Sequence, residues 1–192
     1  MIRHDETGVN VAGRRIAFPE FPLFLLAHLA NVPATVETED IARRVIAGDF
    51  LDADVPTFVR AVCNWGGYAG IAGRVLGRNE PRKLSEAFRA AVADIAAGVD
   101  IAVARLLSLH GLGVSFASKH LRFLSPQACA ILDSKMAAVG GFEQSPAGLA
   151  EYSCLCRTLG ARPFSTGFPA ACFARERSDR EAAAFRGAVL PN

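Results

Sequence analysis

At 192 residues, 51% of them hydrophobic, the chain can bury one substantial core, and it forms most simply a single domain or two small lobes that share an interface. No stretch reaches the roughly 18 apolar residues that span a bilayer, and no secretion signal accompanies the acidic Asp5 and Glu6, so we expect a cytoplasmic protein. The net charge of +2 excludes a strong polyelectrolyte binder, so any nucleic-acid binding must depend on a local basic patch.

Hydrophobic periodicity is helical almost throughout, which predicts an all-α fold of about eight to ten helices. Residues 1–20 are expected to form an N-terminal arm or a short hairpin, and residues 21–192 a single helical domain. Thr38 and Asp100 are well placed as N-caps, and Thr57 is expected to open a helix. The predicted helices cover residues 22–32, 38–47, 57–65, 84–97, 101–110, 115–124, 146–159 and 176–189, and one more begins at position 133.

The cysteines favour reduced thiols over a metal site or disulfides. Their number is odd, and no two of them form a Cys-x-x-Cys pair. Only Cys154 and Cys156 are close together, and one intervening residue is a poor spacing for zinc or a cluster. We therefore expect mostly buried thiols, no metal and no cofactor. The five are Cys63, Cys129, Cys154, Cys156 and Cys172.

Four glycines in the first half of the chain recur at helical spacing. Gly66, Gly70, Gly73 and Gly77 would form a bare strip if this stretch is helical. Two interpretations are open. The strip serves tight helix packing or a helix break, or it allows a DNA strand to approach closely.

Residues 101–124 predict a helix-hairpin-helix element that turns at Gly111-Leu112-Gly113. Two glycines allow a turn whose backbone amides point outward at the start of the next helix. Free amides and the helix dipole together favour an anion, and a DNA phosphate fits such a site without any base contact. The element is therefore predicted to position DNA without reading its sequence.

The helix after this hairpin carries two different faces. Positions 117, 121 and 124 are apolar and are predicted to be buried. A second stripe holds two hydroxyls, two cations and no acid, and we expect it to hold successive phosphates; an ordinary solvated face is the alternative. This stripe consists of Ser115, Ser118, Lys119 and Arg122.

Asp133 follows the apolar tripeptide Ala130-Ile131-Leu132 and is predicted to cap a helix. It lies twenty positions after Gly113. A Gly-apolar-Gly hairpin with an aspartate at a later helix start resembles the helix-hairpin-helix DNA glycosylase superfamily. The stretch 131–133 looks like that of adenine DNA glycosylases. Residues 111–124, with Trp65-Gly66-Gly67 upstream, look like a bacterial group described as having an 8-oxoguanine-glycosylase-like fold.

The resemblance implies double-stranded DNA with modified or damaged bases as the partner. It assigns Asp133 the role of the catalytic carboxylate, which stabilises positive charge developing on the deoxyribose or activates the nucleophile. Lys135 and the hairpin residues would contact DNA. Trp65 is the best candidate to stack on a flipped base, and a core aromatic is the alternative.

Several residues depart from the pattern of the glycosylase superfamily, and these departures limit which glycosylase reactions the chain could catalyse. Ser115 stands where strand-cleaving members keep a Schiff-base lysine, so the chain is similar to monofunctional members that use water. Lys119, one turn further on, is a second candidate catalytic residue, expected to be a surface lysine. Lys135 replaces the histidine of oxoguanine-type members, and the cysteines do not supply the iron–sulfur cluster of adenine-type members.

Three functions remain open from the sequence. The first is a monofunctional DNA N-glycosylase. The second is a DNA-binding protein that keeps the glycosylase fold without the chemistry. The third is a helical protein-interaction domain, which would not bind DNA even at low salt.

Overall fold

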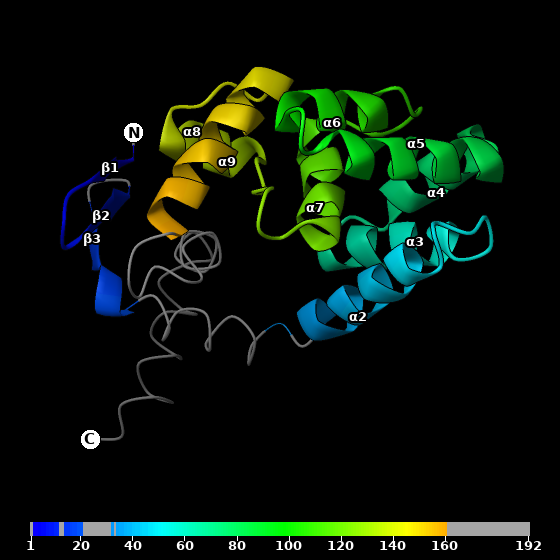
Figure 1. Ribbon diagram of the computed structural model, residues 1–192, viewed down its shortest axis with the longest axis horizontal. Helices are drawn as coiled ribbons and strands as arrows, with labels where there is room; N and C mark the ends of the chain where they lie inside the picture. The colour runs from blue at the N-terminus through cyan, green and yellow to red at the C-terminus, as the bar shows by residue number, and fades with distance from the viewer. Residues whose placement is uncertain (1, 12–13, 21–31, 33, 161–192) are drawn as a thin grey trace.

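The computed structural model describes residues 2–11, 14–20, 32 and 34–160. These residues form eight α-helices and one small antiparallel sheet (Figure 1), which confirms the predicted helical class at this coarse level. The helix predicted to start near Pro22 and the one predicted at 176–189 lie outside the described residues. Within the described ranges, no helix combines the length and apolar character needed to cross a membrane.

The helices follow one another in the order α2 to α9 and make up most of the described chain. They are α2 (Ala34–Ala47), α3 (Val55–Trp65), α4 (Gly70–Arg78), α5 (Pro81–Asp94), α6 (Val99–Leu107), α7 (Val114–Leu124), α8 (Ser134–Gly140) and α9 (Pro146–Gly160). The sheet before them comprises β1 (Arg3–His4), β2 (Gly8–Val11) and β3 (Arg14–Ala17), followed by the 3-10 turn η1 (Phe18–Glu20).

The sheet has the strand order β1-β2-β3, and both pairs are antiparallel. β2 and β3 form the hairpin where the sequence favoured an arm or a hairpin. Val9 pairs with Ile16, and both side chains are fully buried. In Figure 1 the sheet lies at the end of the molecule near α8 and α9, far from α4 and α5. The sheet therefore closes one end of the core, and the hairpin site described below belongs to the helices.

α7 is the central helix of the described structure. It packs against α2, α3, α5, α6 and α9. Ala117, Leu121 and Leu124 are buried, as predicted. Because neighbouring helices surround α7, the residues between these positions are buried as well, except for the half-buried Arg122.

Several predicted helix starts are wrong by two to four residues. α2 begins at Ala34, and Thr38 lies inside it with its hydroxyl donating to the Ala34 carbonyl, so it is not the N-cap. α3 begins at Val55 rather than at Thr57, with a proline in its first turn, where the missing amide costs nothing. α6 is capped by Gly98, and Asp100 lies in its first turn, where a carboxylate favours the helix dipole.

Candidate functional site

The turn between α6 and α7 contains two glycines with different tasks. Gly111 has a φ of +93°, and a Cβ added there would lie 3.3 Å from both the Arg74 Cβ and the Val75 backbone nitrogen. Glycine is therefore required at this position both for the conformation and for the close approach to α4. Gly113 has an ordinary φ of −105°, and a Cβ added there would have no atom within 4 Å. The space beside Gly113 is open.

Free backbone amides face this open space. Gly113 is the N-cap of α7 and makes no side-chain capping bond, and its carbonyl accepts the amides of Phe116 and Ala117. Among the described residues, the amides of Gly113, Val114 and Ser115 have no hydrogen-bond partner. Three free N–H donors at the positive end of a helix dipole form an anion site.

Asn79, directly after α4, fixes the other side of the turn. Its Nδ2 donates to the carbonyls of Val75 at 2.7 Å and His110 at 2.9 Å. Its Oδ1 accepts the amide of His110 at 3.0 Å. The buried amide therefore satisfies both backbone groups of His110 and holds the hairpin against α4.

The side chains of Lys119 and Asp133 form an ion pair close to the hairpin. The Nζ of Lys119 lies 3.6 Å from Oδ2 of Asp133, donates to Oγ of Ser115 at 3.0 Å, and lies 4.9 Å from the centre of the Phe116 ring. The Lys119 side chain is 5% exposed, and that of Asp133 is 17% exposed. We call Ser115, Phe116, Lys119 and Asp133 the Lys119 cluster. It combines an amine, a hydroxyl and a carboxylate one turn from the free amides.

Burial controls the protonation of the groups around this amine. It lowers the pKa of Lys119, whereas the Asp133 carboxylate and Cys63 act in the opposite direction. Burial also raises the pKa of the Cys63 thiol to about 11, although the nearby Lys119 opposes this effect. The thiol therefore stays neutral near pH 7 and serves as a small apolar neighbour of the lysine.

Asp133 is held from three directions. It is the N-cap of α8, as the sequence predicted, and its Oδ1 accepts the Met136 amide at 3.0 Å. The Leu132 amide donates to Oγ of Ser118 at 3.1 Å, and the Ala130 amide donates to Oγ of Ser153 at 3.1 Å. These two buried hydroxyls fix the peptide that leads into Asp133, so the carboxylate has one defined position beside Lys119.

The stripe on α7 that was expected to hold successive phosphates is largely buried or paired, so it is neither a phosphate-binding stripe nor an ordinary solvated face. Ser118 is fully buried with both of its hydrogen bonds inside the protein, and Lys119 is also buried. Arg122 pairs with Glu39 of α2 at 2.7 Å and lies over the Phe123 ring. The reason is the central position of α7, whose sides all face other helices. Ser115 remains at the hairpin, where it binds Lys119.

Two more predicted residues lie in contrasting environments. Lys135 is exposed on α8 and has no ion-pair partner among the described residues. Trp65 is buried, its indole N–H donates to the Thr35 hydroxyl at 2.8 Å, and its ring meets Phe123 edge-on. These contacts are those of a core aromatic, so the structure gives Trp65 no surface on which a base could stack.

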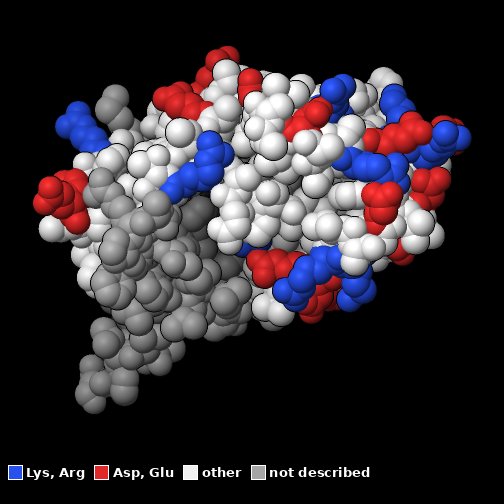
Figure 2. All heavy atoms as spheres, in the orientation of Figure 1, with Lys and Arg blue, Asp and Glu red and all other residues white. Residues whose placement is uncertain are grey.

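Surface charge on the face shown in Figure 2 is mixed. Basic and acidic side chains alternate there, without a large patch of either sign. This pattern agrees with the net charge of +2. Any attraction of a polyanion must therefore come from short segments of the chain, such as 101–132, which contains no acidic residue.

Sequence reasoning missed Asn79, and it missed the contacts, though not the presence, of Cys63 and Ser118. Asn79 gave a usable signal, because asparagine is common where a helix ends. Cys63 and Ser118 gave none, because neither burial beside Lys119 nor a bond to Leu132 can be read from local spacing. Among the described residues, no group of three or more histidines, cysteines or acids is arranged to hold a metal ion.

Comparisons of the chain with protein-family models, with curated proteins and with solved structures found no match.

Proposed function

We propose that this chain binds duplex DNA through the turn between α6 and α7 and acts as a monofunctional DNA N-glycosylase, with Asp133 as its essential carboxylate. The observation that carries the proposal is the 3.6 Å approach of the Asp133 carboxylate to Lys119, on the helix whose first amides are free. A rise of 1.5 Å per residue separates Lys119 from those amides by about 8 Å along α7. About two nucleotides, each ~3.4 Å along a strand, span that distance.

In the proposed reaction, the free amides at Gly113–Ser115 hold a phosphate next to the target nucleotide. The C1′–N bond breaks, the base leaves with the electron pair and takes up a proton, and positive charge develops on the sugar. The Asp133 carboxylate stabilises that charge and accepts a proton from the water whose oxygen bonds to C1′. Such a pre-placed carboxylate contributes several kcal/mol to the barrier reduction in comparable oxocarbenium-like reactions.

The surroundings of Lys119 support water, rather than the amine, as the nucleophile. The side chain is 5% exposed, and its nitrogen is directed to Ser115 and Asp133. An amine in this position orients the carboxylate through the ion pair. The more exposed Asp133 is the group that a sugar can reach.

The test uses 30-base-pair duplexes, each with one modified or damaged base, followed by hot alkali to cleave abasic sites. The wild-type protein is expected to release at least one such base, and Asp133→Asn to lose the activity while retaining DNA affinity. Asparagine keeps the capping oxygen for Met136, so the variant is expected to fold. Activity that persists in Asp133→Asn would remove this residue from the mechanism.

A second candidate is a DNA-binding protein without base-release activity. The observation that favours it is that both carboxylate oxygens of Asp133 already have structural partners, Met136 for Oδ1 and Lys119 for Oδ2. This candidate predicts salt-dependent duplex binding and no abasic product from any substrate. Absence of DNA binding at low salt would instead favour a protein-interaction domain.

A further inference from the structure

The segment 55–79, which forms α3, α4 and the turn between them, contains three arginines and no acidic residue. These are Arg60, Arg74 and Arg78, and all three are exposed. None of them makes an ion pair with a described residue, whereas six arginines elsewhere do. In a chain with almost balanced charge, this segment keeps positive charge available for an external anion.

One side of α4 is bare backbone. A Cβ added at Gly70, Gly73 or Gly77 would have no atom within 4 Å, so these glycines face open space. Of the two interpretations open from the sequence, tight helix packing therefore applies only to Gly66. A Cβ there would lie 2.8 Å from the Phe116 ring. The remaining glycines let an elongated ligand come close to the helix backbone.

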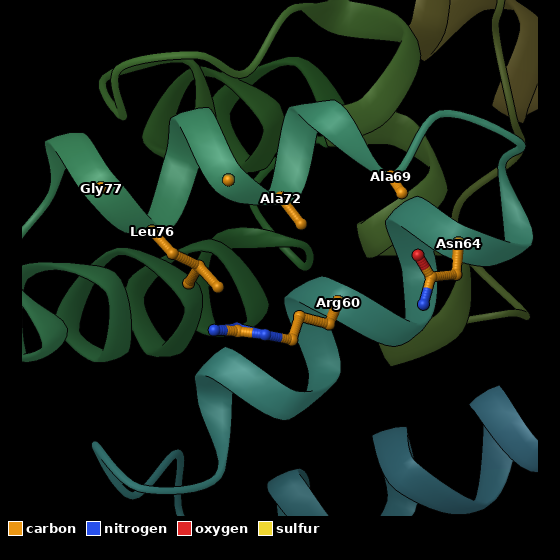
Figure 3. A pocket seen from close by; sticks show the side chains of 7 residues that line it. Arg60, Asn64, Ala69, Ala72, Leu76 and Gly77 are labelled. Atoms are coloured by element: carbon orange, nitrogen blue, oxygen red, sulfur yellow. The ribbon is translucent and has the colours of Figure 1, made fainter.

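A groove runs between α4 and α3, and Gly73 and Gly77 are among the residues that line it. It has a volume of about 530 Å³, and its walls are lined by Arg60 and Asn64 from α3 and by small or aliphatic side chains from α4. Figure 3 shows Arg60 extending along this groove toward Leu76, with Asn64 at the other end. A cation and an amide in a shallow, largely apolar groove suit a sugar-phosphate strand better than a purely apolar partner.

Tyr68 is the most exposed large hydrophobic residue on the described surface. It lies in the turn between α3 and α4, and its exposed fraction is 63%. An exposed aromatic ring is costly to leave in water, and its flat face can stack on a nucleobase. Tyr68 thus offers the exposed ring that the buried Trp65 cannot.

This segment is continuous with the proposed DNA site. At one end, Gly66 lies against Phe116 and Lys119 of the Lys119 cluster, and Tyr68 follows Gly66 by two positions in the chain. Near its centre, Arg74 and Val75 touch Gly111 of the hairpin. α4 therefore borders the hairpin, and the turn before α4 begins beside the Lys119 cluster.

We infer that α4 and the turn before it form a second DNA-contact surface, on which Tyr68 stacks on an unpaired base while Arg60, Arg74 and Arg78 hold the flanking phosphates. The inference rests on the proposed function, because it assumes that the hairpin binds DNA. It adds a preference: DNA containing an unpaired base binds more tightly than a fully paired duplex, since less energy is needed to expose that base.

The test measures binding by fluorescence anisotropy with two labelled 20-base-pair duplexes, one fully paired and one with a single unpaired 2-aminopurine. Wild type is expected to prefer the second duplex and to change 2-aminopurine emission on binding. Tyr68→Ala is expected to lose this emission change and about tenfold in affinity for that duplex, whereas Tyr68→Phe retains both. The fold of each variant is checked by circular dichroism and thermal melting.

The arginines are tested with the double variant Arg74→Ala/Arg78→Ala. It is expected to weaken binding to both duplexes and to reduce the slope of log affinity against log salt by about two. Arg82→Ala is the matched control, because Arg82 is an exposed arginine on the next helix whose charge is paired with Glu86. Its affinity and salt slope are expected to stay within about twofold of wild type.

The outcomes separate the two proposals. If Gly113→Ala weakens binding but the Tyr68 and Arg74/Arg78 variants do not, the hairpin binds DNA and the second surface is overturned. If Tyr68→Ala and Tyr68→Phe bind the unpaired base equally, the stacking role is wrong. If wild type binds neither duplex at low salt, the proposed function and this inference both fail.

Discussion

The hydroxyl of Ser118 accepts a hydrogen bond from the Leu132 amide at 3.1 Å and donates one to the Ser115 carbonyl at 2.9 Å. A single buried side chain of α7 therefore connects the first turn after the hairpin with the peptide before Asp133. The two bonded residues are 14 positions apart in the chain, and their bond is one of the contacts that fix the distance between the hairpin amides and the carboxylate. Ser118 is thus a positioning residue, and a phosphate could not reach it.

Ser118→Ala is expected to lower the free energy of unfolding by about 1–3 kcal/mol, because the Leu132 amide stays buried without an acceptor. Base release is expected to fall as well, since Asp133 loses its fixed position. Urea unfolding measures the first effect, and the alkali-cleavage assay the second. Ser108→Ala is the control, because Ser108 is exposed and bonds only to its own helix. Equal unfolding free energies for the two variants would contradict the positional role.

Alanine at Gly111 and at Gly113 is expected to have opposite effects on folding and binding. Gly111→Ala would place a side chain at a φ of +93° and 3.3 Å from α4, so it is expected to cost roughly 1–3 kcal/mol of stability. At Gly113 the φ is ordinary and an added Cβ would have no atom within 4 Å. Gly113→Ala is therefore expected to lower the free energy of unfolding by less than about 1 kcal/mol. Its methyl group, however, stands beside the free amides.

DNA binding then distinguishes the two glycine variants. Gly113→Ala is expected to weaken duplex binding at least about threefold while its melting temperature stays near that of wild type. Calorimetry gives the melting temperature and fluorescence anisotropy gives the DNA affinity of the same preparations. Unchanged affinity in a folded Gly113→Ala protein would show that no phosphate occupies the anion site.

The features that could be predicted from the sequence are those that depend on the spacing of neighbouring residues. The glycine turn between two helices at Gly111 and Gly113 follows from helix-ending glycines, although α6 ends at Leu107, three residues before the predicted end. The capping role of Asp133 follows from an acid after an apolar run. Both features need only a few neighbouring residues. The same holds for the buried face of α7, which depends on helical periodicity.

The sequence predictions that were wrong concern residues whose environment is set by tertiary packing. A helical stripe of Ser118, Lys119 and Arg122 looks solvated if only one partner helix is assumed, but five helices surround α7. Lys119 is therefore shielded from solvent and pairs with Asp133. Arg122 pairs with Glu39, which lies 83 positions away in the sequence. Trp65 is buried and Tyr68 is exposed for a similar reason. Which of two nearby aromatics is buried depends on distant Thr35 and Phe123.

Lys119 provides a direct test of the monofunctional mechanism. Borohydride reduces a Schiff base to a stable link between protein and DNA, and wild type is expected to give no such link and no strand cleavage without alkali. The reason is that the amine is 5% exposed and faces Ser115 and Asp133. Lys119→Met is expected to reduce base release by disturbing Asp133, and Lys119→Arg to restore part of it. A borohydride-trapped adduct that disappears in Lys119→Met would make Lys119 the nucleophile.

His120 gives the fold a dependence on pH. It is fully buried between the rings of Phe58 and Phe88, with Nδ1 2.6 Å from the Phe116 carbonyl, so Nδ1 carries the proton of the neutral ring. Its Nε2 has no hydrogen-bond partner among the described residues. Burial lowers the pKa of His120 from 6.5 to about 4; the bond to Phe116 acts in the opposite direction, and the neighbouring Lys119 lowers it further.

The unfolded chain therefore takes up a proton on this histidine at a higher pH than the folded protein does. Above pH 6.5 both states are neutral and the stability is complete; as the pH falls from 6.5 to about 4, the unfolded state is favoured progressively, by on the order of 3 kcal/mol in total. Urea unfolding at a series of pH values should show this loss in wild type and in the exposed control His110→Gln. His120→Phe, which cannot be protonated, should retain only the smaller dependence that the carboxylates contribute. An identical profile for His120→Phe and wild type would mean that this histidine does not set the acid limit of the fold.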